Sequence, residues 1–261
     1  NISLKTKAWL DHLPIDSLSP AKLLTAGSWS LGILFLRLKS SLSKGETEVM
    51  QHNHLSRSAR KLQHIEHSLN LGDGPASNGL EDLYLLHQAA PELNLAEVDL
   101  TVQFAGKTLA APLLINALTG GNQRILPINQ GLARVARECG IAMAVGSQTI
   151  ALEDPAAEES FRIVREVNPA GVILANVGAL TCPDWAMKAV EMIRADALQV
   201  HLNVAQELAM VEGDREFRGI LTNLKLLAEQ SPVPVMVKEV GFGLSRETVA
   251  RLAETGIDWV D

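Results

Sequence analysis

Polar groups able to bind ligands stand at the ends of several short apolar stretches of this sequence. They are a hydroxyl, an amide, an imidazole or an ammonium group, at Thr119, Ser147, Asn176, His201 and Lys238. A single residue of this kind often only forms a turn. If the stretches are parallel strands of one barrel, however, their carboxyl ends meet at one mouth. We therefore expect the five groups to converge on a common site.

Lys238 carries the strongest chemical signal, because it follows the apolar run VPVMV at residues 233–237. Burying an ammonium group is costly unless an anion accompanies it. Lys238 is therefore predicted to face an anionic ligand. The alternative is an ion pair with a nearby carboxylate of the protein.

Residues 201–207 (HLNVAQE) form a second dense group of ligand types, directly after a predicted strand. Glu207 could bind a hard divalent cation, since Mg²⁺ is usually held by one or two carboxylates together with substrate phosphates and water. Gln206 could hydrogen-bond to a substrate. Alternatively, both residues open a helix, where an acidic side chain favours the helix dipole.

Three cations and a histidine gather in residues 57–64 (RSARKLQH). Arg60, Lys61 and His64 are spaced so that they could bind a diphosphate through charge-assisted hydrogen bonds. Arginine and lysine are mostly solvated at protein surfaces, so the segment by itself favours a surface role.

The elements that must position these groups follow a regular alternation. Six continuous apolar runs are typical of strands buried on both faces, at residues 111–118, 141–147, 171–178, 197–203, 233–240 and 257–261. Helical periodicity predicts helices at residues 128–139, 158–167, 183–194, 220–230 and 246–254. Gly140 is expected to cap the end of the first helix, and Ser245 to begin the last.

The spacing of the runs favours a barrel. Strands recur about every 25 to 35 residues, the period of a βα unit. The first strand is followed by Thr119-Gly120-Gly121-Asn122, which lacks the glycine fingerprint of an open dinucleotide-binding sheet. We expect an α/β fold, a TIM (β/α)₈ barrel apparently truncated after the sixth strand. We divide the chain into an N-terminal extension of unknown origin, residues 1–49, and an incomplete barrel domain, residues 50–261.

Composition argues against other classes of protein. A net charge of −7 without a basic stripe disfavours nucleic-acid binding. Cys139 and Cys182 are far apart, which fits a reducing, cytoplasmic location better than a disulfide framework. The most apolar stretch, residues 23–36, is shorter than the roughly 20 residues that span a bilayer, so no membrane partner is expected.

Six motifs occur in an order and spacing that point to one family. They are Arg60-Lys61-x-x-His64, Ala117-Leu118-Thr119-Gly120-Gly121, Gly146-Ser147-Gln148, Ala175-Asn176-Val177-Gly178, His201-Leu202-Asn203-x-x-Gln206-Glu207 and Val237-Lys238-Glu239-Val240-Gly241-x-Gly243. From about Ser56 to the last residue, the chain resembles the type 2 isopentenyl diphosphate isomerases. The HLNxxQE and VKEVGxG strings are, in combination, highly specific. Leu118 replaces the family's usual methionine, a near-isosteric change that we expect to be tolerated.

The resemblance implies an FMN-dependent barrel enzyme of isoprenoid biosynthesis that converts isopentenyl diphosphate into dimethylallyl diphosphate. Mg²⁺ and NADPH, the reductant, would be the other cofactors, and reduced FMN would act as acid and base without net oxidation. By position, the flavin would be lined by Ala117, Leu118, Thr119, Ser147, Asn176 and Lys238. Substrate would be bound by Arg60, Lys61, His64 and Gln206. Catalysis would fall to His201, Asn203 and Gln206, and Glu207 would hold the metal.

The resemblance also implies a homo-oligomer, and it places the FMN phosphate in glycine-rich loops after the seventh and eighth strands, which this sequence does not include. Two alternatives stay open. One is another FMN-dependent barrel oxidoreductase, of the α-hydroxy-acid oxidase type, although HLNxxQE and RKxxH argue against it. The other is an inactive, truncated fragment.

Overall fold

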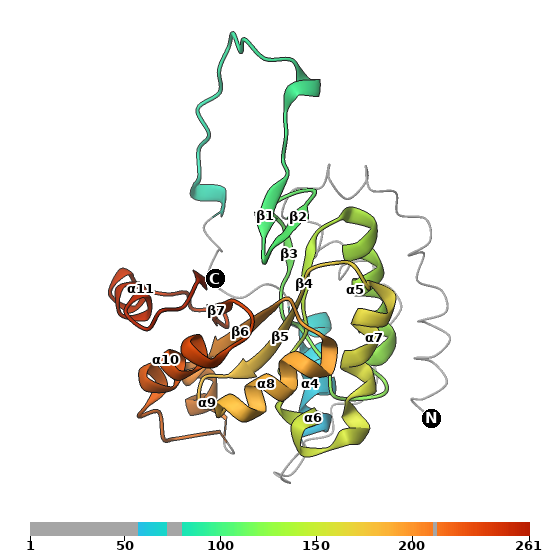
Figure 1. The fold of residues 1–261 in the computed structure, drawn as a ribbon, viewed down its shortest axis with the longest axis vertical. Coiled ribbons are helices and arrows are strands. Elements are labelled where there is room, and N and C mark those ends of the chain that lie inside the picture. The colour runs from blue at the N-terminus through green and yellow to red at the C-terminus, as the bar shows by residue number, and fades with distance from the viewer. Residues whose placement is uncertain (1–56, 72–79, 211–212) are drawn as a thin grey trace.

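The computed structural model of the chain describes residues 57–71, 80–210 and 213–261, which form a parallel sheet with helices packed against it (Figure 1). The predicted extension at residues 1–49, and with it the predicted boundary at residue 50, lies outside the described residues.

The main sheet has six strands, all parallel, and their order in the sheet is their order along the chain. The strands are β3 (Leu114–Ile115), β4 (Ala142–Ala144), β5 (Ile173–Gly178), β6 (Ala197–Leu202), β7 (Val235–Glu239) and β8 (Trp259–Val260). Each lies within one of the six predicted runs. Successive βα units in this order build the wall of a barrel. The α/β class and a half-barrel of six strands are thereby confirmed.

The five predicted helices are also present, with ends within two residues of those expected. They are α5 (Leu126–Cys139), α7 (Glu159–Val167), α8 (Pro183–Ile193), α10 (Ile220–Gln230) and α11 (Arg246–Ala253). Gly140 ends α5 with a φ of 63°, a left-handed conformation that glycine adopts easily. The hydroxyl of Ser245 accepts a hydrogen bond from the N–H of Thr248 and so caps the start of α11.

Several shorter or more polar elements were not among the predicted helices and strands, although a helix opening at Gln206 and Glu207 was one of the two interpretations of residues 201–207. They are the helices α4 (Arg57–Asn70), α6 (Thr149–Glu153) and α9 (Val204–Ala209), the antiparallel hairpin β1 (Val102–Phe104) and β2 (Lys107–Leu109), and the 3-10 turns η3 (Leu80–Asp82), η4 (Leu95–Glu97) and η5 (Pro155–Ala157). Between η3 and β1 the chain runs as a long excursion away from the sheet (Figure 1). Tyr84, Leu85 and Leu95 are exposed there, so this excursion adds little to the core.

The two faces of the sheet pack against different partners. Because strand side chains alternate, Met143 and Val145 of the β4 segment join the core shared with the helices, which includes Phe161 and Val164 of α7. Ala144 belongs to a separate, inner cluster. The inner cluster contains strand residues together with the hairpin, and in the described part of the chain no helix contributes to it.

The β1–β2 hairpin covers the amino-terminal end of this inner face. The rings of Phe104 and Trp259 lie 4.6 Å apart, and Leu109 is buried in the inner cluster. The ammonium group of Lys107 donates to the carbonyl oxygen of Gly171 and lies 2.6 Å from a carboxylate oxygen of Asp196. Gly171 and Asp196 directly precede β5 and β6, so the hairpin is fixed at the amino ends of the strands.

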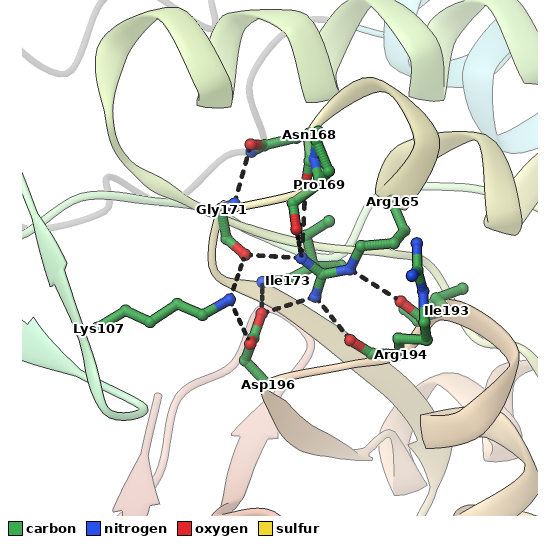
Figure 2. A network of polar contacts seen from close by, with 9 residues as sticks. All are labelled: Lys107, Arg165, Asn168, Pro169, Gly171, Ile173, Ile193, Arg194 and Asp196. Atoms are coloured by element: carbon green, nitrogen blue, oxygen red, sulfur yellow. Dashed lines mark hydrogen bonds and ion pairs between the residues drawn. The ribbon is translucent and has the colours of Figure 1, made fainter.

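A buried arginine organises the same end of the sheet (Figure 2). Arg165 of α7 is only 5% exposed, and its guanidinium donates to five main-chain carbonyl oxygens. These oxygens belong to Asn168, Pro169, Gly171, Ile193 and Arg194. The group therefore bridges the ends of α7 and α8 and the start of β5.

Asp196 completes this network as the counter-ion. One carboxylate oxygen accepts from Arg165 at 2.7 Å and from the N–H of Ile173 at 2.9 Å. Burial opposes ionisation, but hydrogen bonds from Lys107, Arg165 and Ile173 outweigh it and hold the pKa of Asp196 below its usual range. Asp196 is thus a stable anion that ties β5 to β6.

Arg165→Met should lower the free energy of unfolding by about 3–5 kcal/mol, because it leaves buried carbonyl groups without donors. Arg162 is a matched control on the same helix. Its side chain is 56% exposed and pairs with Glu158, so Arg162→Met should cost less than about 1 kcal/mol. Urea unfolding of the two variants measures both values. Equal losses would contradict a central role for Arg165.

Candidate functional site

The inner face of the sheet changes from apolar to polar toward the carboxyl ends of the strands. The inner cluster contains Leu174, Ala197 and Met236 of β5, β6 and β7. Two residues further along each strand, on the same face, stand Asn176, Gln199 and Lys238. A ligand site is therefore expected at the carboxyl-terminal mouth, as in other parallel barrels.

Three of the five strand-end groups named from the sequence lie on neighbouring strands. His201 of β6 is opposite Gly178 of β5 on one side and Lys238 of β7 on the other. The Nδ1 atom of His201 lies 2.9 Å from the Oδ1 atom of Asn176. The structure thus brings together Asn176, His201 and Lys238.

Lys238 is buried, with 8% of its surface exposed. Its ammonium group donates to the main-chain oxygen of Glu239 and forms no ion pair with a carboxylate in the described part of the chain. The alternative role, an ion pair within the protein, is therefore not seen among these residues. A buried cation without a counter-ion fits a site for an anionic ligand.

His201 is held neutral by its surroundings. Burial lowers the pKa of the ring to about 4, with further contributions from the positive charges of Lys61 and Lys238. Lys61 is half-buried in α4, far from His201 in the sequence. Its electrostatic effect on His201 indicates that α4 contributes to the environment of the strand-end site.

The other predicted members of the α4 group are only partly described. Arg60 and His64 lie in the same helix as Lys61, but the structure does not describe their side chains. Of the three residues predicted to bind the diphosphate, Lys61 is thus the one for which the structure gives an electrostatic effect on His201.

The main chain that follows β3 lies close to the main chain at the end of β4. The N–H of Gly146 donates to the carbonyl oxygen of Thr119 at 3.0 Å. A side chain at Gly146 would lie 2.7 Å from the main chain of Thr119, so glycine allows this approach. The Thr119 hydroxyl is buried and has no hydrogen-bond partner among the residues that the structure describes. Buried polar groups are normally satisfied, so this one suggests a contact made by a ligand.

The remaining predicted flavin-lining residues surround that junction. Ala117 is half-buried and follows Asn116, whose side chain accepts from its N–H. Leu118 is 46% exposed. Ser147 is half-buried and lies 3.2 Å, oxygen to oxygen, from Thr149.

Asn203, Gln206 and Glu207 form a compact polar group after β6. The amide nitrogen of Asn203 donates to Glu207 at 2.7 Å and approaches Gln206 at 3.4 Å. The second carboxylate oxygen of Glu207 accepts from the N–H of Asp214 at 2.9 Å. Gln206 and Glu207 also lie in the first turn of α9, as the alternative interpretation expected. The helix and the polar group are therefore compatible.

Two glutamines support the site: Gln148, which the sequence offered only as part of the Gly146-Ser147-Gln148 motif, and Gln199, which sequence reasoning missed. Gln148 is fully buried and exchanges two hydrogen bonds with the main chain of Asn176, at 2.8 and 3.0 Å. Gln199, also fully buried, donates to the side chain of Asn116 and accepts from that of Asn176. A glutamine in the middle of the run ALQVHLN was the only available signal, because a buried amide needs partners.

Other kinds of site find less support in the described residues. No group of three or more His, Cys, Asp or Glu side chains there could hold a metal ion by itself. Among the described helices, none has the length and apolar character needed to cross a bilayer. A surface hollow of about 300 Å³ is lined by residues of α6, η5, α7 and α8, including Arg162 and Lys188, outside the inner face.

Fold and site together define an α/β half-barrel protein with a cationic, polar site at the carboxyl ends of its strands. The isopentenyl-diphosphate delta-isomerase of Moorella thermoacetica is 54% identical over 211 residues, 81% of this chain and 60% of that protein. That of Symbiobacterium thermophilum is 53% identical over 188 residues, 72% of this chain and 52% of that protein. The chain is thus similar to isopentenyl-diphosphate delta-isomerases over about four fifths of its length.

The chain spans about 60% of the length of the first of these relatives. No protein-family model matches it. Among solved structures, a soluble mutant of the membrane-associated (S)-mandelate dehydrogenase from Pseudomonas putida is similar, with a TM-score of 0.49 and 19% identity. That similarity covers 66% of this chain and 56% of the dehydrogenase chain.

The free energy of unfolding should decrease as the pH is lowered, because of His201. Between pH 6.5 and about 4 the unfolded ring binds a proton that the folded ring does not, so acid favours unfolding. From pH 7 to pH 5 the wild-type chain should lose about 2 kcal/mol more unfolding free energy than His201→Gln. Urea unfolding at both pH values measures the difference. His87→Gln, at an exposed position, should behave as wild type. The same pH dependence in wild type and His201→Gln would contradict a buried, neutral ring.

Proposed function

We propose that this chain forms part of a type 2 isopentenyl-diphosphate delta-isomerase, which converts isopentenyl diphosphate into dimethylallyl diphosphate. The observation that carries the proposal is the pair of Lys238 and neutral His201 on neighbouring strands, with the charge of Lys61 in α4 acting on His201. This pair occurs in a chain that is 54% identical to the isomerase of Moorella thermoacetica. Buried cations suit a substrate and a cofactor that are both anionic.

The described residues fit FMN as the cofactor. Two donors at the mouth lack a suitable partner within residues 57–71, 80–210 and 213–261. There the ammonium group of Lys238 has only a carbonyl oxygen, and the hydroxyl of Thr119 has no acceptor. Ala117, Leu118, Ser147 and Asn176 would line the same ligand. Bound in reduced form, FMN would supply acid–base chemistry at the substrate double bond without net oxidation. Lys238 would stabilise negative charge on the ring.

The described residues also fit Mg²⁺, provided that the substrate shares its coordination. Glu207 is a single half-buried carboxylate, oriented by Asn203 and the N–H of Asp214. A lone carboxylate with substrate phosphates and water is a usual Mg²⁺ environment. Arg60, Lys61 and His64 would bind the diphosphate, and Gln206 would hydrogen-bond to the substrate.

The remaining parts of the proposal concern the protein's own residues and its setting. His201 and Asn203 would orient the substrate, and the apolar inner cluster beneath them would exclude water from the reacting carbons. NADPH as the reductant, a homo-oligomeric assembly and a cytoplasmic location are part of the same proposal.

An anaerobic assay tests the isomerase directly. This chain and, in parallel, the product of the reading frame continued to its stop codon are incubated with FMN, Mg²⁺, NADPH and isopentenyl diphosphate. We expect dimethylallyl diphosphate to form and to disappear when FMN is omitted. The Moorella thermoacetica relative is the positive control. A folded, flavin-loaded protein that forms no product here, but consumes oxygen with a 2-hydroxy acid in a separate aerobic assay, would overturn the proposal in favour of an oxidoreductase.

Lys238→Met should weaken FMN binding at least tenfold, because it removes the buried cation nearest the proposed ring. Quenching of flavin fluorescence on titration with protein measures the dissociation constant. Lys225→Met is the matched control, since Lys225 is 63% exposed on α10 and faces Glu229. Unchanged FMN affinity in a folded Lys238→Met protein would remove Lys238 from the flavin site.

A further inference from the structure

We propose that Asn176 and Gln199 are positioning residues that fix His201 as the Nδ1–H tautomer and leave its Nε2 atom as a hydrogen-bond acceptor in the site. The tautomer follows from hydrogen bonds within the chain. Its consequence for catalysis rests on the proposed isomerase function.

The argument starts at a donor whose identity is certain. The main-chain N–H of Ala117 donates to the side chain of Asn116 at 2.8 Å. A main-chain nitrogen can only donate, so the atom of Asn116 that it meets is the amide oxygen. The amide nitrogen of Asn116 correspondingly donates to the carboxylate of Asp261. The orientation of the Asn116 amide is therefore fixed.

This orientation determines the two amides that follow. The Asn116 oxygen lies 2.9 Å from Gln199, which must present its NH₂ group there. The oxygen of Gln199 then faces Asn176 at 2.8 Å and accepts from the NH₂ group of Asn176. The remaining atom of Asn176 is its oxygen, 2.9 Å from Nδ1 of His201. Because that oxygen only accepts, Nδ1 must carry the proton.

Reversing any one of these three amide groups would set two donors or two acceptors against each other. A flipped Asn176 would set two oxygens against each other at its contact with Gln199. Flipping Gln199 as well would move the clash to Asn116, which is held by the N–H of Ala117. Asn176 and Gln199 are 2% and 0% exposed, so bulk water offers little compensation for a broken bond.

The consequence lies on the other side of the ring. A neutral imidazole has one N–H, so the Nε2 atom of His201 carries a lone pair. No described residue forms a hydrogen bond with Nε2. The facing residue on β5 is Gly178, where a side chain would begin only 3.5 Å from Nε2. Glycine thus leaves room for a ligand atom beside this nitrogen.

The tautomer restricts which ligand group His201 can meet. Burial, together with the positive charges of Lys61 and Lys238, disfavours a second proton on the ring, so Nε2 accepts a hydrogen bond and does not donate one. An ionised phosphate oxygen is also an acceptor and cannot pair with it. His201 is therefore assigned to a donor group or an ordered water near the reacting carbons, and the diphosphate to cations such as Lys61.

The direct test is nitrogen NMR without any ligand. The protein is prepared with ¹⁵N-labelled histidine, and His201 is assigned by the signal lost in His201→Gln. The shifts of its two ring nitrogens and their couplings to the ring protons report which nitrogen carries hydrogen. We expect Nδ1–H at pH 7. A wild-type ring with hydrogen on Nε2 overturns the proposal, without reference to any variant.

Variants test the role of Gln199. Gln199→Leu removes the acceptor that holds Asn176, so the ring should lose its Nδ1–H preference and populate both tautomers. Gln103→Leu, which removes an exposed glutamine in β1, is the matched control and should leave the ring unchanged. A folded Gln199→Leu protein with pure Nδ1–H would remove Gln199 from the proposal.

Kinetics separate this inference from the proposed function. In an active isomerase, Gln199→Leu should lower kcat roughly tenfold or more, while FMN affinity stays within about twofold. If wild type is inactive as an isomerase but shows Nδ1–H, the proposed function fails and the positioning role stands. If wild type is active and shows Nε2–H, the inference alone fails.

Discussion

One buried guanidinium, that of Arg165, fixes the framework on which the site depends. It joins the ends of α7 and α8 to the start of β5, and through Asp196 to the start of β6 (Figure 2). Asp196 also accepts from the N–H of Ile173, so both strands begin from one shared anchor. A shift of one residue in either strand would turn its side chains to the opposite face. The inward direction of Asn176 and His201 is therefore determined at the far end of the sheet.

From this anchor toward the carboxyl ends of the strands, the inner face of the sheet changes from apolar to polar. Apolar side chains such as Leu174 and Ala197 pack beneath the hairpin, and the buried amides of Asn176 and Gln199 follow them. Amides are costly in such a position unless every polar atom has a partner. Here Gln199 and Asn176 satisfy each other and link on to Asn116 and His201. These amides thus form a layer of oriented polar groups next to the packed apolar core.

The sequence predicted the strands and helices well because their signals are local. Continuous apolar runs, the left-handed Gly140 and the capping Ser245 each act within a few neighbouring residues. The charged helix α4 was missed as an element, because its segment RSARKLQH is strongly polar overall and was interpreted as a cation cluster. Gln199 was missed for a different reason. Its partner Asn116 is 83 residues away, and no local pattern identifies such a pair.

The buried cations at the two ends of the half-barrel differ in how many acceptors they have. At the amino ends, Arg165 is 5% exposed and its guanidinium has a carboxylate and five carbonyl oxygens as acceptors. At the carboxyl ends, Lys238 is nearly as buried, but in the described part of the chain it meets one carbonyl oxygen, and the hydroxyl of Thr119 meets none. A chain selected for stability alone would not keep such groups unsatisfied, because each lowers the stability of the fold. The position of Lys238 beside neutral His201 is best explained by a ligand that supplies the missing acceptor when it binds.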